Sequence, residues 1–168
     1  ILAVVAPPRL KLEDLKLSKA PLLVVAESLE KPGNLGAILR TCDGAGVDAL
    51  IVCDGATDLY NPNVIRASLG TVFSVPVVQS SSDAALKFLK GRGIKTCAMS
   101  PQAKTIYTGA DLKGPIAVVV GSEEDGLSEL WMKQADMKVN IPMRGHADSL
   151  NVSTTAAIVI YEALRQRQ

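Results

Sequence analysis

The sequence predicts an α/β domain with a mostly parallel, doubly wound sheet. Apolar runs of strand length alternate along the chain with amphipathic stretches of helix length, which is the order produced by successive β-α-β units. Most of the apolar runs are nearly continuous in Val, Ile, Leu and Ala, as expected for parallel strands buried on both faces. Aromatic residues make up only 4% of the chain, so the core favours strands covered by helices over an aromatic-rich β-sandwich.

The predicted strands are the apolar runs that lie between turn residues. In chain order they are Leu2–Val5, Leu22–Ala26, Ala49–Val52, Ser74–Val78, Lys95–Met99, Ile116–Gly121 and Met137–Asn140.

The predicted helices lie between these strands. They are Leu35–Gly44, Asn63–Leu69, Asp83–Lys90, Ser128–Lys133 and Val152–Arg165. Asn34 is a candidate N-cap for the first helix. Asn61-Pro62 places a cap residue before a proline at the start of the second, and Ser82-Asp83 is a similar start signal for the third.

The length of 168 residues fits one domain. Residues 22–168 are expected to form that domain, and residues 6–21 are expected to be a linker with a short helix. The chain begins with Ile rather than Met. We therefore expect a piece of a longer protein, in which residues 1–21 connect the domain to a region upstream.

Composition excludes several classes of protein. The three cysteines are scattered and there is one histidine, so a structural zinc site is not expected. The unpaired cysteine pattern favours a reducing cytoplasm, and no apolar run is long enough to span a membrane. The net charge of +1 is low for a nucleic-acid binder. An RNA-binding role would therefore need charge from another domain or a second subunit.

Three loops are more polar or richer in glycine than their neighbours require, and ligands of doubly wound sheets bind where such loops follow the strands. Residues 30–47 contain Asn34 and Arg40. Residues 118–130 contain Gly121 and Gly126 around three acids. The spacing of these glycines resembles a phosphate loop, but no Lys-Ser/Thr follows and the acids would repel phosphate. The second loop therefore favours a neutral or cationic ligand, and a sulfonium fits it better than ATP.

Each loop also has a purely structural interpretation. Asn34 and Arg40 could be a helix cap and a solvated side chain, or they could face a phosphate or ribose. The acids of the second loop could simply favour a helix N-terminus. The third loop, within residues 141–157, offers Ser149, Asn151, Ser153 and Thr154 as caps for the last helix. One cap would suffice, so this surplus favours a functional site.

Taken together, the three loops resemble the three motifs of the SpoU (TrmH-like) branch of the SPOUT RNA methyltransferases. The first motif, Asn-x-Gly-x-x-x-Arg, matches residues 34–40, and the second, Gly-x-Glu-x-x-Gly, matches residues 121–126. The third matches Ile141-Pro142-Met143 and then Ser149-Leu150-Asn151-Val152-Ser153. The segment from Asn61 to Gly70 also resembles the family, and Glu124 departs from it where many members carry Gly.

This resemblance implies a carboxyl end threaded as a deep trefoil knot, a homodimer, S-adenosylmethionine as methyl donor, and a ribose 2′-hydroxyl of structured RNA as acceptor. It also implies that residues 22–168 are the catalytic domain and that a substrate-binding domain precedes residue 1. The knot could not be deduced from periodicity, because threaded chains are almost absent among folds. The residues implied to bind the cofactor are Met99, Gly121, Ile141, Met143, Leu150 and Ser153.

The resemblance also implies catalytic and RNA-binding residues. Arg40 matches the proposed activator of the 2′-hydroxyl. Since a guanidinium is almost always protonated, it could act as a base only if strongly perturbed, and it could instead orient the ribose and stabilise developing negative charge. The other expected catalytic positions are Asn34, Glu123, Ser149 and Asn151. Arg66 and Ser68 are expected to contact RNA, and the chemistry requires no metal.

Three other functions are left open by the sequence. The same chemistry could act on transfer RNA instead of ribosomal RNA, although ribosomal RNA is favoured. The chain could be a non-catalytic RNA-binding or assembly factor, but the intact Asn34, Arg40 and Glu123 argue against this. An ordinary nucleotide-dependent enzyme is disfavoured by the acidic second loop.

Overall fold

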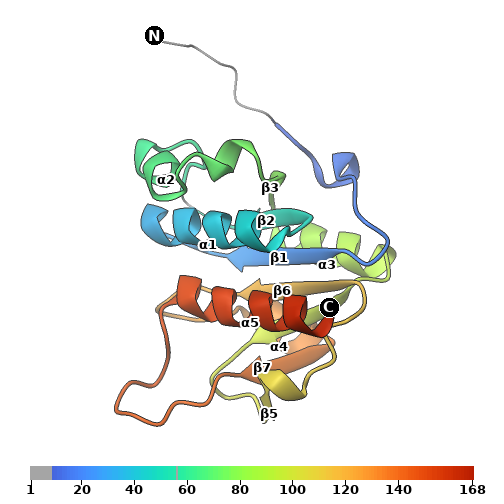
Figure 1. The fold of residues 1–168 in the computed structure, drawn as a ribbon, viewed down its shortest axis with the longest axis vertical. Helices are drawn as coiled ribbons and strands as arrows, with labels where there is room; N and C mark the ends of the chain where they lie inside the picture. The colour runs from blue at the N-terminus through green and yellow to red at the C-terminus, as the bar shows by residue number, and fades with distance from the viewer. Residues whose placement is uncertain (1–8, 56) are drawn as a thin grey trace.

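A seven-stranded parallel sheet forms the centre of the molecule (Figure 1). The computed structural model describes residues 9–55 and 57–168. The strand order is β3-β2-β1-β6-β4-β7-β5, and every paired strand runs parallel to its neighbour. The strands are β1 (Leu22–Glu27), β2 (Ala49–Cys53), β3 (Val77–Ser80), β4 (Lys95–Met99), β5 (Thr105–Ile106), β6 (Ile116–Val120) and β7 (Met137–Asn140). The predicted α/β fold class is confirmed.

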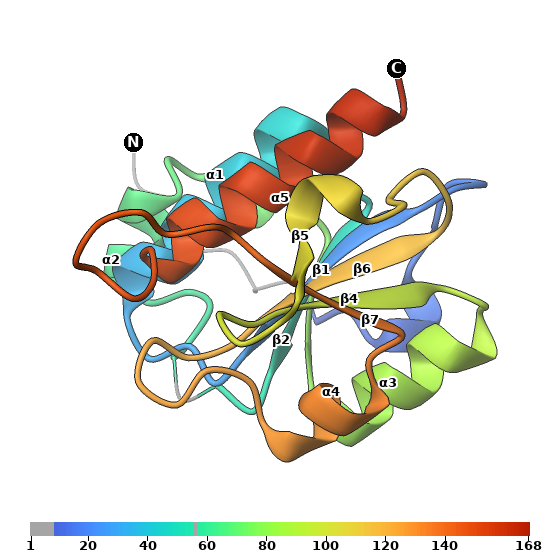
Figure 2. The same ribbon diagram turned by 90° about the horizontal axis from the view of Figure 1, so that it is seen from below.

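Helices cover both faces of the sheet (Figure 2). One face packs against α1 (Pro32–Ala45), α2 (Pro62–Ala67) and α5 (Val152–Gln166), and the other packs against α3 (Ser82–Gly91) and α4 (Glu129–Gln134). Alternate residues of β1 show the division, because Val24 packs with the first group and Val25 with the second. This double coverage explains why the central strands are buried throughout.

The chain before β1 also packs on the domain. A short 3₁₀ helix spans Leu12–Asp14, as the sequence predicted for this segment. Leu12 and Leu15 are buried in the same cluster as residues of α3. The predicted strand Leu2–Val5 lies outside the described residues. The assignment of residues 1–21 as a connection to an upstream domain stays a prediction.

The third predicted strand was misplaced. Ser74–Val78 was expected, but β3 spans Val77–Ser80. A 3₁₀ helix at Thr71–Phe73 ends directly before the predicted range, and the backbone N–H groups of Ser74 and Val75 both donate to the Thr71 carbonyl, so these two residues close the helix instead of joining the sheet. The two-residue strand β5 was not predicted, because it is too short to give a periodic signal.

The first predicted helix began too late. Asn34 was expected to cap it, but α1 begins at Pro32 and its N-cap is Lys31, which makes no side-chain cap hydrogen bond. Proline suits this position because its fixed φ is helical and its missing N–H needs no partner there. Asn34 therefore lies in the first turn of α1, and its side chain is available for contacts elsewhere.

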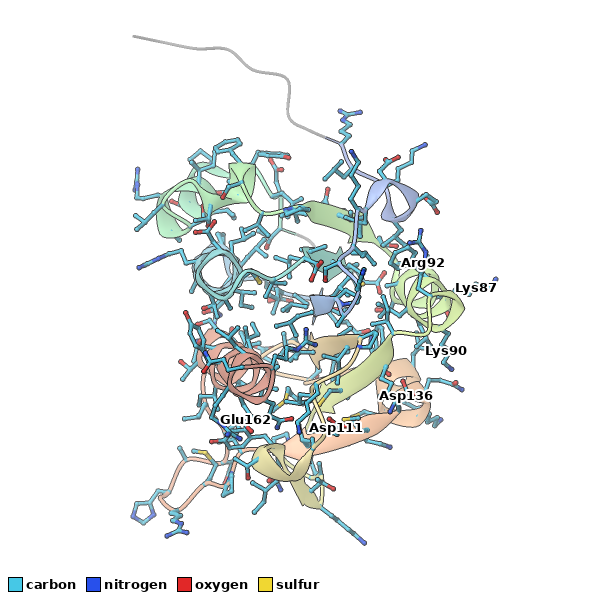
Figure 3. All side chains as sticks on the ribbon, turned by 45° about the vertical axis from the view of Figure 1, so that its right-hand side comes forward. Lys87, Lys90, Arg92, Asp111, Asp136 and Glu162 are labelled. Carbon is cyan, nitrogen blue, oxygen red and sulfur yellow. The ribbon has the colours of Figure 1, made fainter. Side chains whose placement is uncertain are left out.

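Asp136 fixes the position of α4 and β7 against β4 (Figure 3). Its carboxylate accepts hydrogen bonds from the backbone N–H and the hydroxyl of Thr96, each at 2.8 Å. Burial opposes ionisation of Asp136, but these bonds outweigh it and lower the pKa of the carboxyl below its usual value. On the same side of the molecule, Lys87 and Lys90 extend from α3, and Arg92 follows the last residue of this helix (Figure 3).

The trefoil knot stays a prediction, because strand order and register do not define how the chain is threaded. Within residues 9–55 and 57–168, no helix has the length and apolar character needed to cross a membrane. In the same part of the chain, no three His, Cys, Asp or Glu side chains are grouped in a way that could hold a metal ion.

Candidate active site

A pocket of about 550 Å³ opens beyond the carboxyl ends of β4, β6 and β7. Four segments line most of it: the residues after β4, the loop after β6, the end of β7 with the loop that follows, and the start of α5. The predicted residues among its walls are Met99, Gly121, Glu123, Ile141, Met143, Ser149, Leu150 and Asn151. Strands of this kind of sheet end at a common edge, which explains why segments distant in sequence meet here.

Glu123 joins the three sequence motifs. One carboxylate oxygen, Oε1, accepts a hydrogen bond from the Asn34 side-chain amide. The same oxygen accepts a hydrogen bond of 3.1 Å from the amide of Asn151, which also donates to Asn34 Oδ1 at 3.1 Å. The other oxygen, Oε2, lies 2.9 Å from the ammonium of Lys31. Glu123 thus holds the loop after β6 against the starts of α1 and α5.

Asn151 performs two tasks at the start of α5. Its amide nitrogen contacts Asn34 and Glu123 as described above. Its oxygen accepts hydrogen bonds from the backbone N–H of Ser153 at 2.9 Å and from the Ser153 hydroxyl at 2.6 Å. Asn151 is therefore the N-cap of the helix. Of the four candidate caps in the sequence, Asn151 serves as the cap, and Ser149 lines the pocket instead.

Gly121 allows the loop after β6 to close tightly. The backbones of Ser122 and Gly126 exchange hydrogen bonds of 2.9 and 3.2 Å, and Gly126 has a left-handed φ of 70°. A Cβ on Gly121 would lie 2.1 Å from the Gly126 carbonyl oxygen. Only glycine fits at position 121 without opening the loop, so the two glycines of the second motif have a physical explanation.

The charges around the pocket are mostly negative. Its lining includes Glu123, Glu124, Asp125 and Asp148, against the single cation Lys31. The hydrogen bond and charge of Glu123 raise the pKa of Lys31 above its ordinary value. The side chain of Lys31 is 70% exposed, so the ion pair contributes little to stability. The pocket therefore favours a ligand that carries positive charge.

Not every predicted site residue lies in the pocket. Asn34 and Ser153 contact residues that line it. Arg40 does not line it: it is exposed, two turns along α1 from the pocket. Among the described residues, the Arg40 side chain makes no hydrogen bond or ion pair. Arg66 is also exposed and away from the pocket.

Ser68 corrects one expectation. The resemblance implied an RNA contact, but Ser68 is fully buried and its hydroxyl donates to the Ile65 carbonyl at 3.0 Å. It ends α2 where this helix meets α1. A Cβ on Gly36 would lie 2.5 Å from Ala67 Cβ and 2.8 Å from the Ser68 nitrogen. Ser68 therefore has no surface for a direct contact with RNA. Gly36 and Ser68 both serve the packing of α1 on α2.

Several residues that line the pocket were not predicted as site residues from the sequence, among them Lys31 and Asn140. Lys31 precedes the proline at the helix start, and nothing in the sequence distinguishes it among the 18 lysine and arginine residues. Asn140 is a polar residue at the end of a predicted buried strand, and this position could have been noticed. Its amide nitrogen donates to the Ala103 carbonyl, and its oxygen is buried.

Comparison with known proteins agrees with this geometry. The model of the SpoU rRNA Methylase family matches residues 21–161. A 23S rRNA (guanosine(2553)-2′-O)-methyltransferase of Bacillus subtilis is 33% identical over 146 residues, which are 87% of this chain and 59% of the relative. A 23S rRNA (guanosine-2′-O-)-methyltransferase of Ralstonia nicotianae is 37% identical over 148 residues, with 88% and 59% covered. The chain thus spans about three fifths of the length of these relatives.

A solved structure is also similar over nearly the whole chain. It is the SpoU methyltransferase AviRb of Streptomyces viridochromogenes in complex with the cofactor AdoMet. The TM-score is 0.90 at 32% sequence identity, and the match covers 95% of this chain and 66% of the other.

Proposed function

The chain belongs to the SpoU rRNA Methylase family, and from this premise we propose that it transfers a methyl group from S-adenosylmethionine to a ribose 2′-hydroxyl of ribosomal RNA. One observation supports this most strongly: Asn34, Glu123 and Asn151, one from each motif, are joined by hydrogen bonds at the mouth of one pocket. The AdoMet complex of the similar AviRb structure supports the same cofactor.

The pocket fits S-adenosylmethionine in size and chemistry. Its volume of about 550 Å³ lies within the range of small-molecule sites. The acidic loop suits a sulfonium and an ammonium, and the apolar side chains of Met99, Ile141 and Leu150 suit an adenine ring. When bound, the cofactor supplies the methyl group. The proposed binding residues are Met99, Gly121, Ile141, Met143 and Leu150, with Ser153 supporting them through Asn151.

The protein must align the acceptor oxygen and stabilise the charge that develops on it. Alignment of this kind can contribute about 7–11 kcal/mol. Ser149 and Asn151 line the pocket, and they are proposed to orient the ribose. Arg40 is proposed to neutralise charge on the 2′-oxygen, since a guanidinium presents several donors in a fixed fork.

A homodimer would explain how Arg40 can take part in catalysis although it lies away from the pocket of its own chain. Arg40 does not line the pocket of its own chain, and it lies on the exposed side of α1. Tyr161, on the neighbouring helix α5, is 49% exposed. Its hydroxyl lies against α1, since a Cβ added to Gly44 would be 3.2 Å from it. A second copy packed on this side could complete either the pocket or the RNA-binding surface.

The RNA target is proposed from relatives that are longer than this chain. Both of the relatives described above are named for action on 23S rRNA, which favours ribosomal over transfer RNA. Arg66 stays a proposed RNA contact because it is exposed, and a cytoplasmic location fits the three buried free cysteines. The net charge of +1 predicts weak, salt-sensitive RNA binding by this chain alone.

Two experiments test the proposal. The first is calorimetric titration of the purified chain with S-adenosylhomocysteine, with light scattering on the same sample. Micromolar binding by a dimer is expected, and a folded chain that does not bind would favour the non-catalytic alternative.

The second supplies S-adenosylmethionine labelled in its methyl group together with unmethylated transcripts of 23S rRNA and of transfer RNA. Label is expected in the ribosomal transcript. Alkaline hydrolysis should leave the labelled nucleotide joined to its 3′ neighbour, because the cleavage needs a free 2′-hydroxyl. Label on a base, or on the transfer RNA alone, would contradict the proposal.

A further inference from the structure

We propose that Glu27 is a positioning residue for the cofactor pocket: it holds the loop after β6 in place by binding Ser128, where this loop enters α4. The inference rests on the proposed function, because it assumes that S-adenosylmethionine occupies the pocket. Glu27 is the last residue of β1 and does not line the pocket itself. It lies outside the segments that match the three motifs, and it takes no part in the hydrogen-bonded cluster around Glu123.

Both oxygens of the Glu27 carboxylate bind Ser128. Oε2 accepts a hydrogen bond of 2.8 Å from the backbone N–H of Ser128, and Oε1 accepts one of 2.7 Å from its hydroxyl. Oε1 also accepts a hydrogen bond of 2.7 Å from the hydroxyl of Ser82, the first residue of α3. Because the two oxygens bind two donors of one residue, they fix the orientation of Ser128 as well as its position.

The surroundings of Glu27 explain why a carboxylate stands at this position. The residue is 3% exposed, and within the described chain no lysine or arginine pairs with it. Burial of a carboxylate without a cation is costly unless hydrogen bonds satisfy its oxygens. A neutral amide has one acceptor oxygen instead of two and could not accept from all three donors. Two of the three hydrogen bonds that require a carboxylate here come from Ser128.

Ser128 does not perform the usual task of a serine at its position. It is the N-cap of α4, where a serine side chain commonly accepts a hydrogen bond from a backbone N–H of the first turn. Ser128 makes no such bond. Its hydroxyl donates to Glu27 instead. The side chain of Ser128 therefore links the end of the loop to β1 and does not stabilise the start of the helix.

This link secures the second end of one pocket wall. Residues 121–127 all line the pocket, and Ser128 follows them directly. The first half of this wall is held by Glu123, which binds Asn34 and Asn151. Without Glu27, the second half would lose its hydrogen bonds to the sheet. A loop that is ordered before the ligand arrives loses less entropy on binding, so the contact should strengthen cofactor binding although Glu27 does not touch the ligand.

The test compares Ser128→Ala with Ser82→Ala. Each substitution removes one hydroxyl that donates to the same oxygen of Glu27 at 2.7 Å, but Ser82 lies in α3 and Ser128 adjoins the pocket wall. Ser82 also accepts a hydrogen bond of 3.1 Å from the buried indole of Trp131, so its loss should lower stability at least as much. S-adenosylhomocysteine is titrated into each variant by calorimetry, and urea unfolding measures stability.

Ser128→Ala should weaken S-adenosylhomocysteine about threefold, because the bond from its backbone N–H remains, and Glu27→Ala should weaken it about tenfold. Ser128→Thr keeps a hydroxyl and should bind normally. Ser82→Ala should keep its affinity while its urea midpoint falls. The double variant of Glu27 and Ser128 should bind no more weakly than Glu27→Ala alone, because both residues act through one contact.

Hydrogen exchange of the backbone amides tests the link without a ligand. Exchange in residues 121–128 should become faster in Glu27→Ala and in Ser128→Ala, and it should not change in Ser82→Ala. If Glu27→Ala does not fold, the comparison of the two serine variants decides the question.

A role in folding alone would give a different pattern. Ser128→Ala would then lower stability but leave affinity and exchange unchanged, or both serine variants would weaken S-adenosylhomocysteine by the same factor. Either result would overturn the inference and leave the proposed function standing. If the unmodified chain itself binds no S-adenosylhomocysteine, the proposed function is wrong and the inference falls with it.

Discussion

The Asn34 side chain donates a hydrogen bond to the Glu123 carboxylate, although 89 positions separate the two residues in the sequence. This contact joins the first turn of α1 to the loop after β6, and Asn151 completes it from the start of α5. The three motifs are therefore parts of one hydrogen-bonded cluster. The variants below separate the contribution of this cluster from the contributions of its neighbours.

Glu123→Ala should weaken S-adenosylhomocysteine about tenfold, because the loop after β6 would lose its hydrogen bonds to Asn34 and Asn151 and its ion pair with Lys31. The measurement is calorimetric titration. Glu124→Ala is the control, since Glu124 lies in the same loop, carries the same charge and makes no hydrogen bond or ion pair within the described chain. Equal losses in both variants would show that charge, rather than the contacts of Glu123, determines binding.

Arg40→Lys should lower methyl transfer roughly 100-fold and leave the affinity for S-adenosylhomocysteine unchanged. The charge is kept, but the fork of donors is lost, and Arg40 does not line the pocket. The rate is measured with labelled S-adenosylmethionine and the RNA substrate. Arg92→Lys is the control and should retain its rate; Arg92 follows the last residue of α3, and its guanidinium lies over the Phe88 ring. Near-normal turnover of Arg40→Lys would refute the catalytic role.

Gly36→Ala should destabilise the protein by about 1–3 kcal/mol, because the new methyl group would lie 2.5 Å from Ala67 Cβ where α1 meets α2. Gly33→Ala in the same helix has no heavy atom within 4 Å of the added Cβ. It should be neutral, or stabilising by up to about 1 kcal/mol. Urea unfolding followed by circular dichroism measures both. A neutral Gly36→Ala would mean that the two helices can separate without cost.

The three cysteines should be unreactive in the folded protein. Cys42, Cys53 and Cys97 are buried and free, and burial raises the pKa of each thiol to about 12. Since the thiolate is the reactive form, a thiol-specific chromogenic reagent at pH 8 should titrate almost none of them. All three should react at once after unfolding in guanidinium. Fast reaction of one thiol in the folded state would reveal local opening around that residue.

Glu162→Gln should destabilise the protein near neutral pH but not in acid. Arg165 and Gln166 donate hydrogen bonds of 2.8 Å to this carboxylate on α5 (Figure 3), and they lower its pKa from 4.5 to about 2. A depressed pKa stabilises the fold above the unfolded value of 4.5. This stabilisation is lost as the pH falls from about 4.5 to about 2.

The difference between the urea midpoints of Glu162→Gln and the unmodified chain should therefore shrink over this range. Glu129→Gln is the matched control. Glu129 pairs with Lys133 on the surface, where its side chain is 86% exposed, so this substitution should have no measurable effect at any pH. A pH-independent loss in Glu162→Gln would indicate a packing effect rather than the ionisation of the carboxyl.

The sequence by itself determined the α/β class, six of the seven strands at least in part, and the residues of the three motifs. These features are local: continuous apolar runs define buried parallel strands, and Asn61 caps α2 through the backbone N–H of Asn63 as its sequence indicates. The membership in the SpoU family also followed from residues at fixed spacing. Local signals misplaced the strand expected at Ser74–Val78, where a 3₁₀ helix and a strand follow closely on each other. They also misplaced the start of α1, which begins at Pro32 and is not capped by Asn34.

Only the tertiary structure decided which of these residues meet. Asn34, Glu123 and Asn151 form one cluster because the carboxyl ends of parallel strands lie at the same edge of the sheet, and no spacing along the chain encodes this contact. Burial likewise depends on packing from all directions, which is why Ser68 proved to be enclosed and Arg40 exposed. The contact between Glu27 and Ser128 became visible for the same reason, since the partners of an atom are known only when all its neighbours are placed.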